Sequence, residues 1–145
     1  MRTDDHPAIG AEESAIDLAL RLTSALAARD ADALRSLFGR EVDFRGLTPS
    51  RVWEAGTPEA LVRDVILGAW FEADDVIQRV ESVQASHVGR RTRIGYRLQV
   101  SNARGRFTVE QQAFLDLTDG KITWLRVLCS GFVPATRASA WAVSC

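Results

Sequence analysis

The sequence predicts an α+β domain in which helices pack against one face of an antiparallel sheet. Apolar residues recur at helical spacing in the first half of the chain, and near Asp75 this period gives way to long strand-like runs. Links of only a few residues join those runs, which favours antiparallel hairpins, because parallel neighbours need crossovers of a dozen residues or more. Helices followed by a meander of strands are typical of an α+β domain.

Composition and charge are those of one globular domain. Of 145 residues, 46% are hydrophobic and 26% are charged, and the formal net charge is −1. This charge balance gives no electrostatic attraction to nucleic acid or to anionic membranes. The chain shows no signal-peptide pattern at its start, and no apolar run reaches the ~20 residues of a membrane span. We therefore expect a cytoplasmic protein with no nucleic-acid or membrane partner.

The expected organisation is a polar N-terminal arm over residues 1–10, one domain over 11–134, and a C-terminal tail over 135–145. A domain of this length can bury roughly two thirds of its unfolded surface. Two cysteines, Cys129 and Cys145, are too few for a disulfide scaffold. We expect both to be free thiols.

Three segments are predicted to be helical. The first, over about 11–29, carries a wide apolar stripe after acidic residues in its first turn. Asp30 is an expected N-cap for a short second helix that ends at Gly39. The third opens with Pro58 at its first position, behind a threonine N-cap, and runs to about Phe71.

Five segments are predicted to be strands. Residues 41–47 alternate apolar and polar side chains, as a half-buried strand does, and a Thr-Pro-Ser turn signal follows them. Four longer runs come after the third helix, separated by turn candidates that contain glycine. These runs are 76–88, 91–100, 106–117 and 121–133.

Hairpin spacing assigns the side chains of the last three strands to two faces. A three-residue loop over 118–120 pairs Ala113 with Leu125, and the preceding hairpin pairs Gln111 with Tyr96. One face is nearly all apolar and is expected to meet the helices. It carries Ile94, Tyr96, Leu98, Val109, Gln111, Ala113, Leu125, Val127 and Cys129. The opposite face mixes charges with three large apolar side chains, which is typical of a partner surface.

The order of elements resembles the nuclear-transport-factor-two-like superfamily, which includes SnoaL-like polyketide cyclases, ketosteroid isomerases and limonene epoxide hydrolases. The segments LTSALAARDADALRSLFGREVDFRGL and DGKITWLRV are similar to that family's opening helices and first strand and to its final hairpin. The resemblance covers residues 11–134. It implies a cone-shaped, strongly curved sheet packed against three helices, with a pocket between helices and sheet.

The resemblance also implies a homodimer through the outer face of the sheet. The mixed face described above matches this implied interface. Arg97 or Arg126 is expected to pair with Glu110 across the two-fold axis. The interface residues expected are Arg97, Glu110, Gln112, Phe114, Trp124, Arg126 and Leu128.

The catalytic residues of the resembled enzymes do not carry over. Where ketosteroid isomerases have a basic aspartate at the end of the first strand, this chain has Arg45-Gly46-Leu47. Their acidic oxyanion-hole residue falls near Ala113, and their tyrosine on the first helix falls near Leu22. The water-activating arginine and aspartates of limonene epoxide hydrolases correspond to Gln111, Ala113 and Val127. The carboxylates of both chemistries are absent, so catalysis stays open.

Six residues are expected to line a ligand pocket. Gln111 is the one clearly polar side chain on the inner face; it either orients a ligand or forms a buried polar pair with Tyr96. Tyr96 is either a donor to a carbonyl or an aromatic wall. Cys129 is either a reactive thiol or a buried apolar group. The expected pocket residues are Phe44, Trp53, Tyr96, Gln111, Val127 and Cys129.

A proton-transfer enzyme needs a general base at the pocket. The weak candidates are His87 near a strand end, Glu54 beside a tryptophan, and Asp43, whose alternation makes it face away from the cavity. Glu54 is either a pocket acid or a partner of an arginine at the rim. Asp74-Asp75 is expected to form a solvated turn. The two histidines lie in the arm and at position 87, so we expect no metal site. No cofactor is expected.

Four arginines form the one basic cluster, at a hairpin and on the outer face. Neighbouring acidic side chains are available as counter-charges, which argues against nucleic-acid binding. The arginines are Arg90, Arg91, Arg93 and Arg97, and the counter-charges are Glu81, Glu110 and Asp116.

Together these observations favour a SnoaL-like protein that binds a small hydrophobic molecule. The alternative is an isomerase, cyclase or hydrolase that acts by proton transfer on a small carbonyl or polycyclic compound.

Overall fold

The computed structural model describes residues 9–135, with side chains from residue 14 onward. The arm expected over 1–10 and the tail expected over 135–145, with Cys145, therefore lie outside the described residues, apart from positions 9, 10 and 135. Residues 9 and 10 belong to the first turn of a helix.

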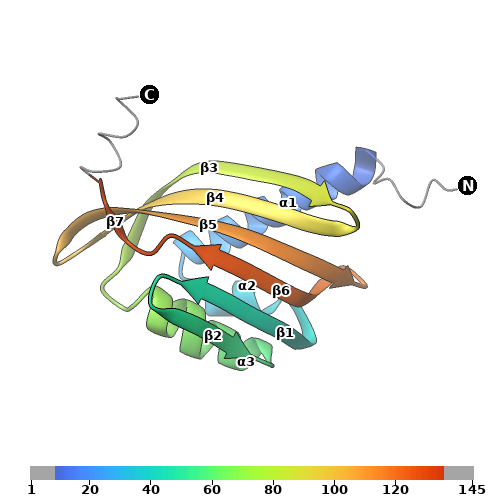
Figure 1. Ribbon diagram of the computed structural model, residues 1–145, viewed down its shortest axis with the longest axis horizontal. Helices are drawn as coiled ribbons and strands as arrows, with labels where there is room; N and C mark the ends of the chain where they lie inside the picture. The colour runs from blue at the N-terminus through green and yellow to red at the C-terminus, as the bar shows by residue number, and fades with distance from the viewer. Residues whose placement is uncertain (1–8, 136–145) are drawn as a thin grey trace, which may run out of the picture.

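The predicted helices are present (Figure 1). They are α1 (Ile9–Ala27), α2 (Ala31–Arg35), α3 (Pro58–Ala60) and its direct continuation η2 (Leu61–Trp70). Both predicted N-caps are confirmed: Asp30 Oδ1 accepts the Ala33 N–H at 3.0 Å, and Thr57 Oγ1 accepts the Ala60 N–H at 3.2 Å.

The turns of η2 are wider than those of an α-helix, because each backbone N–H reaches the carbonyl five residues back. The last of these bonds runs from the Phe71 N–H to the Ile66 carbonyl at 2.9 Å. Such π-helical turns are rare and are often found at functional sites. The predicted inner residues of this segment, Leu61, Val65, Ile66 and Trp70, are all buried.

The strands form one curved sheet. Its order is β2-β1-β6-β5-β4-β3, and the short β7 pairs with β5. The bounds are β1 (Phe38–Thr48), β2 (Arg51–Ala55), β3 (Val76–Val88), β4 (Arg91–Asn102), β5 (Gly105–Thr118), β6 (Lys121–Cys129) and β7 (Val133–Pro134). The predicted antiparallel meander from β3 to β6 is confirmed.

Four details of the sheet differ from the prediction. The sheet is not wholly antiparallel, since β1 pairs with β6 in parallel; the long connection between them, with helices and four strands, permits this. The run over 121–133 breaks at Gly131, whose φ of +76° turns the chain into β7. Arg51–Ala55, which lies between a turn signal and a helix start and was not predicted to be a strand, pairs with β1 as β2. Strand β1 begins at Phe38, inside the segment expected to be helical.

The register between β5 and β6 also differs. Ala113 lies opposite Val127 and not Leu125. The loop has two residues, Asp119 and Gly120, both at positive φ as a tight hairpin turn requires, and a bulge follows at Thr123. Each feature moves the register by one residue in the same direction. Because side chains alternate with a period of two, the predicted faces survive, and the β4–β5 register is confirmed.

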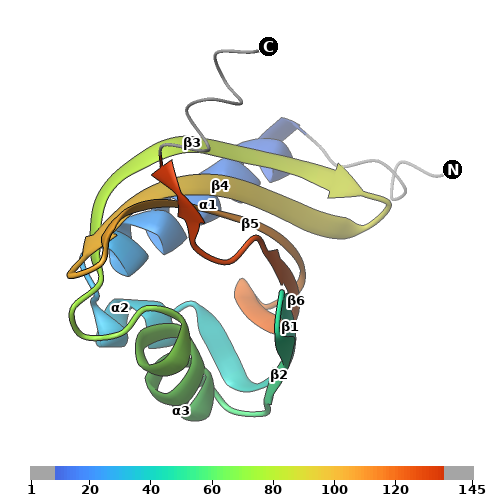
Figure 2. The same ribbon diagram turned by 60° about the vertical axis from the view of Figure 1, so that its left-hand side comes forward.

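The helices cover the concave face of the sheet. Figure 2 shows the sheet curling from β3 round to β2, with the helices inside the curve. Helix α1 packs on β3 and β4, and η2 lies against β2 and α2. The core between them includes the apolar face predicted from the hairpins, Ile94, Leu98 and Val109 being fully buried there. The α+β cone architecture is therefore confirmed.

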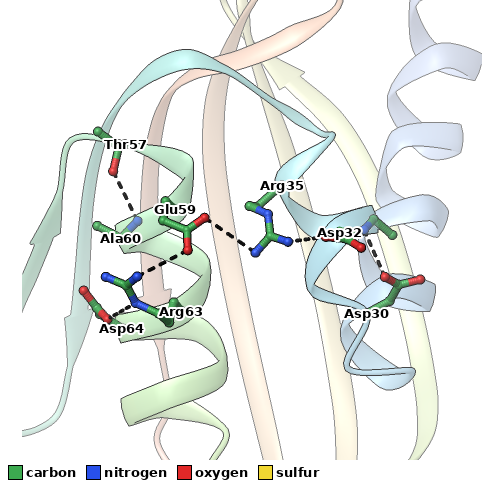
Figure 3. A network of polar contacts seen from close by, with 9 residues as sticks. Asp30, Asp32, Arg35, Thr57, Glu59, Ala60, Arg63 and Asp64 are labelled. Carbon is green, nitrogen blue, oxygen red and sulfur yellow. Dashed lines mark hydrogen bonds and ion pairs between the residues drawn. The ribbon is translucent and has the colours of Figure 1, made fainter.

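Ion pairs hold α3 next to α2 on the surface (Figure 3). Arg35 of α2 contacts both Asp32 and Glu59, the second at 3.7 Å, and Arg63 pairs with Glu59 at 3.3 Å and with Asp64 at 3.0 Å. Exposed pairs of this kind contribute at most about 1 kcal/mol each. We interpret the network as fixing the position of α3, and so of η2, beside α2.

No helix within residues 9–135 is both long enough and apolar enough to cross a membrane.

Candidate functional site

A small cavity lies inside the curve of the sheet. Its volume is about 30 Å³, and side chains of α1, α2, η2 and the sheet line it. Nearly all of them are apolar; Tyr96 and Gln111 bring the hydroxyl and amide groups. A space of this size holds about one water molecule. The interior is therefore too small for an organic ligand.

A larger hollow opens next to this cavity, and we call it the mouth. Its volume is about 330 Å³. The β1–β2 turn, the end of η2, the β4–β5 turn and the segment after β6 surround it. Trp70, Phe71 and Gln111 line both the mouth and the interior cavity, so the two hollows adjoin. Small-molecule sites occupy roughly 300–1,000 Å³, a range that the mouth enters and the interior does not.

The six expected pocket residues are divided between these hollows. Phe44, Tyr96 and Val127 line the interior cavity, and Trp53 and Cys129 line the mouth. Gln111 lines both. The structure thus distributes the six residues over two adjoining hollows, the larger of which is lined by Trp53 and Cys129.

A row of buried polar groups crosses three strands at the junction. Tyr96, Gln111 and Cys129 are direct neighbours in the register of β4, β5 and β6. The Tyr96 hydroxyl donates to Gln111 Oε1 at 2.5 Å, and Gln111 Nε2 donates to Cys129 Sγ at 3.3 Å. Burial raises the pKa of Tyr96, so its hydroxyl stays protonated and acts as a donor. The predicted pair of Gln111 with Tyr96 is confirmed.

Comparisons with known proteins identify the fold and not a close relative. No family model and no curated protein matches the chain. A solved structure named "Putative Isomerase from Bacillus subtilis" matches with a TM-score of 0.68 at 8% identity, covering 81% of this chain and 87% of its own. An ntf2-like protein of unknown function from Mesorhizobium loti matches at 0.61 and 19% identity, covering 87% and 98%. An LEH-like epoxide hydrolase of M. tuberculosis matches at 0.57 and 14% identity, covering 82% and 84%.

The chain has the nuclear-transport-factor-two-like fold. At these identities the likeness concerns the architecture, and function depends on the side chains in the cone. Leu22, Gln111, Ala113 and Val127, which the resemblance aligns with catalytic residues, all line the interior cavity. Among the described residues, no carboxylate or imidazole lines that cavity.

The three candidate bases lie away from both hollows of this nuclear-transport-factor-two-like cone. Glu54 is exposed and lies 3.8 Å from Arg45, the rim ion pair that the sequence offered as one alternative. Asp43 faces outward, as predicted, and pairs with Arg126 at 3.2 Å. His87 lies near the far end of β3, and its Nδ1 is buried without a hydrogen-bond partner among the described residues. None of the three lines the interior or the mouth.

Asp75 is the functional candidate that sequence reasoning missed. The expected solvated turn is wrong for this residue, because Asp75 is only 5% exposed and lines the mouth. Its carboxylate accepts the Glu72 N–H at 2.8 Å and Asn102 Nδ2 at 2.9 Å. It thereby ties the end of η2 to the end of β4. The bond to Glu72 is local, and an aspartate at this spacing is a turn signal that can be found in the sequence. The bond to Asn102 joins residues that are distant in sequence, so no local pattern indicates it.

The expected dimer residues share the outer face of the sheet. A groove of about 560 Å³ crosses this face, and Glu110, Gln112 and Leu128 line it. The Trp124 ring lies against two guanidinium groups, Arg91 at 3.6 Å and Arg126 at 4.4 Å from its centroid. Leu128, which is 54% exposed, therefore has a larger exposed fraction than the partly buried Trp124.

The charges on the outer face have partners within the chain. Arg97 pairs with Glu110 at 3.2 Å, and Arg91 pairs with Asp116 at the same distance. These two counter-charges of the basic cluster are as predicted. The sequence predicts that Glu110 pairs with an arginine of the partner across a two-fold axis. In the single chain, the Glu110 carboxylate already pairs with Arg97.

Proposed function

We propose that the chain binds one small, largely apolar molecule in the mouth, with Gln111 as the group that orients it. The observation that carries the proposal is the place of Gln111 between the two hollows. Its side chain is 2% exposed, and one amide hydrogen goes to a thiol sulfur, which is a weak acceptor. The second amide hydrogen is available to a ligand. Trp53, Trp70, Phe71 and Phe132 supply apolar walls.

Proton-transfer catalysis is the alternative, and the geometry supports it less well. Similar structures carry the names of an isomerase and an epoxide hydrolase. A base must lie within hydrogen-bond reach of the substrate. The carboxylates at the mouth are Glu72 and Asp75, and both oxygens of Asp75 already accept hydrogen bonds that hold the chain in place.

Replacing Gln111 with leucine is expected to weaken binding about tenfold, the equivalent of one hydrogen bond of ~1.4 kcal/mol. The ligand comes from a thermal-shift panel of steroids, polyketide-like aromatics and terpenoids. A bound compound at 100 times its Kd adds about 2.7 kcal/mol of stability. Gln84→Leu is the matched control, because Gln84 is exposed on β3 and lines neither hollow nor the outer groove.

Equal affinity of the Gln111→Leu variant and the wild type would contradict the role of Gln111, and a panel without any binder would contradict the mouth as a site. Leucine leaves the Tyr96 hydroxyl without its acceptor, which can lower stability by about 1–3 kcal/mol. The double variant Tyr96→Phe/Gln111→Leu removes both partners of the buried bond. It therefore tests the role of Gln111 in binding even if the single variant does not fold.

We also propose that a second copy of the chain covers the outer face. Val52, Leu47 and Leu128 are neighbours in register across β2, β1 and β6, and each is about half exposed. A continuous apolar row of this kind is typical of an interaction surface.

Leu128→Asp is expected to convert the dimer to a monomer of 16.0 kDa, measured by light scattering at micromolar concentration. A buried, unpaired carboxylate in the interface opposes association. Val88→Asp is the control, since Val88 is 58% exposed on β3 and outside the outer groove. A wild-type chain that is monomeric at this concentration would refute the dimer.

A further inference from the structure

The mouth and the outer groove have one wall in common, which we call the shared wall. Thr48, Pro49 and Cys129 line both hollows, and they come from the end of β1, the β1–β2 turn and the end of β6. A sheet is a single layer of backbone, so a partner that packs on the outer groove contacts residues that also border the mouth.

The exposed apolar row of the outer face lies on the same strand segments. Each of its three residues directly precedes a residue that lines the mouth. The row is Leu47, Val52 and Leu128, and the residues that follow them are Thr48, Trp53 and Cys129. Because neighbouring side chains of a strand lie on opposite faces, one stretch of backbone carries both the row and this side of the mouth. A partner that fixes the row therefore also fixes backbone that the mouth uses.

Two hydrogen bonds join groups of the mouth to the shared wall. Trp53 Nε1 donates to Thr48 Oγ1 at 3.0 Å, and Gln111 Nε2 donates to Cys129 Sγ at 3.3 Å. The same sulfur accepts the Gly131 N–H at 3.4 Å, at the corner where the chain leaves β6. The orientation of an aromatic side chain and of the amide proposed to orient the ligand thus depends on the position of the shared wall.

The shared wall includes the edge of the sheet. Strand β2 has five residues and is the last strand in the order β2-β1-β6-β5-β4-β3. Leu47 and Val52 of this hairpin are about half exposed. Segments with few buried apolar contacts open more readily than the core of a domain. A second copy on the outer groove adds such contacts and holds the shared wall in place.

We infer that dimerisation and ligand binding are coupled through the shared wall, so that the dimer binds an apolar molecule in the mouth more tightly than the monomer. This inference rests on the proposed ligand and on the proposed dimer, and it adds the regulation of that site. A wall that the partner has already ordered leaves less conformational entropy to be lost when the molecule binds. Coupling is reciprocal, so the bound molecule strengthens the dimer by the same factor.

Equilibrium dialysis of naphthalene, a neutral two-ring hydrocarbon, against the wild-type chain tests the inference. The Kd of naphthalene is measured at protein concentrations well above and well below the Kd of the dimer, which light scattering provides. We expect the dimer to bind naphthalene about tenfold more tightly, a factor within the usual range for coupled sites. Saturation with naphthalene is expected to lower the Kd of the dimer to match.

Two variants of the shared wall test its part in the coupling. Thr48→Val removes the acceptor of the Trp53 indole, and Cys129→Ala removes the acceptor of the Gln111 amide. Each is expected to reduce the coupling factor, after a melting curve has verified the fold. Thr23→Val is the matched control and should keep the factor, because its hydroxyl bonds within α1 and lines neither the mouth nor the outer groove.

The outcomes separate this inference from the proposals on which it rests. If the wild type dimerises and binds naphthalene with the same Kd in both states, the inference is overturned and the ligand and dimer proposals stand. A coupling factor that is unchanged in both wall variants also overturns it. A wild type that stays monomeric overturns the inference together with the dimer. Failure of naphthalene to bind either state overturns it together with the mouth as an apolar site.

Discussion

Replacing Phe44 with alanine is expected to lower the free energy of unfolding by about 3–5 kcal/mol, the range for a large aromatic side chain deleted from a core. Phe44 is among the largest fully buried side chains, and it packs edge-on against Trp70. Its ring lines the interior cavity, which has room for about one water molecule. The deletion therefore enlarges this cavity. Urea denaturation at equilibrium measures the loss.

Leu20→Ala is the matched control for this prediction. Leu20 lies on α1 and is 50% exposed, so its loss leaves no enclosed void. We expect it to lower stability by about 1 kcal/mol, as is usual for a single substitution. The Phe44→Ala void should also take up a benzene-sized apolar probe, as dry engineered cavities do. Equal losses in the two variants would contradict the placement of Phe44 in the core.

Gly46→Ala is expected to lower stability by about 1–3 kcal/mol, because it adds a methyl group where the core has no room. A Cβ at this position would lie 2.7 Å from Cζ2 and Cη2 of Trp70 and 2.8 Å from the Phe44 ring. Both rings are buried and cannot move away freely. The same substitution is expected to displace the Trp70 indole and so weaken ligand binding at the mouth.

Gly56→Ala separates this steric effect from a general effect of removing glycine. A Cβ at Gly56 would meet nothing within 4 Å, and its φ lies outside the left-handed region. We therefore expect no loss, or a gain of up to about 1 kcal/mol from the reduced freedom of the unfolded chain. Thermal and urea unfolding of both variants, with near-ultraviolet circular dichroism of the tryptophans, checks the pair. A neutral Gly46→Ala would show that β1 and η2 are less closely packed than described.

The two faces of the sheet were predictable although the register of one hairpin was not. Alternation along β5 and β6 assigns Gln111 and Cys129 to the inner face and Gln112 and Leu128 to the outer face. A change in the pairing register by an even number of residues leaves this assignment unchanged. The tight turn and the bulge at Thr123 each moved the pairing by one residue. An error of a single residue would have exchanged the faces and hidden the polar row.

The missed elements have weak local patterns. Arg51–Ala55 is short and lies between two strong signals, so only its pairing with β1 makes it a strand. Asp75 follows a helix in an acidic stretch that looks solvated, and its burial depends on Asn102 at the end of β4. In both cases the partner that decides the structure is supplied by another part of the chain.

Local patterns were therefore enough for the helices, their caps, the meander, the inner face and the buried pair of Gln111 with Tyr96, because period and capping act over a few residues or across one short hairpin. The mouth was decided only in the tertiary structure. It is built from the β1–β2 turn, the end of η2, the β4–β5 turn and the segment after β6, which meet through the curvature of the sheet. Its volume, and the burial of Trp70 beside it, depend on how side chains from those separate segments fill space, and no single segment carries that information.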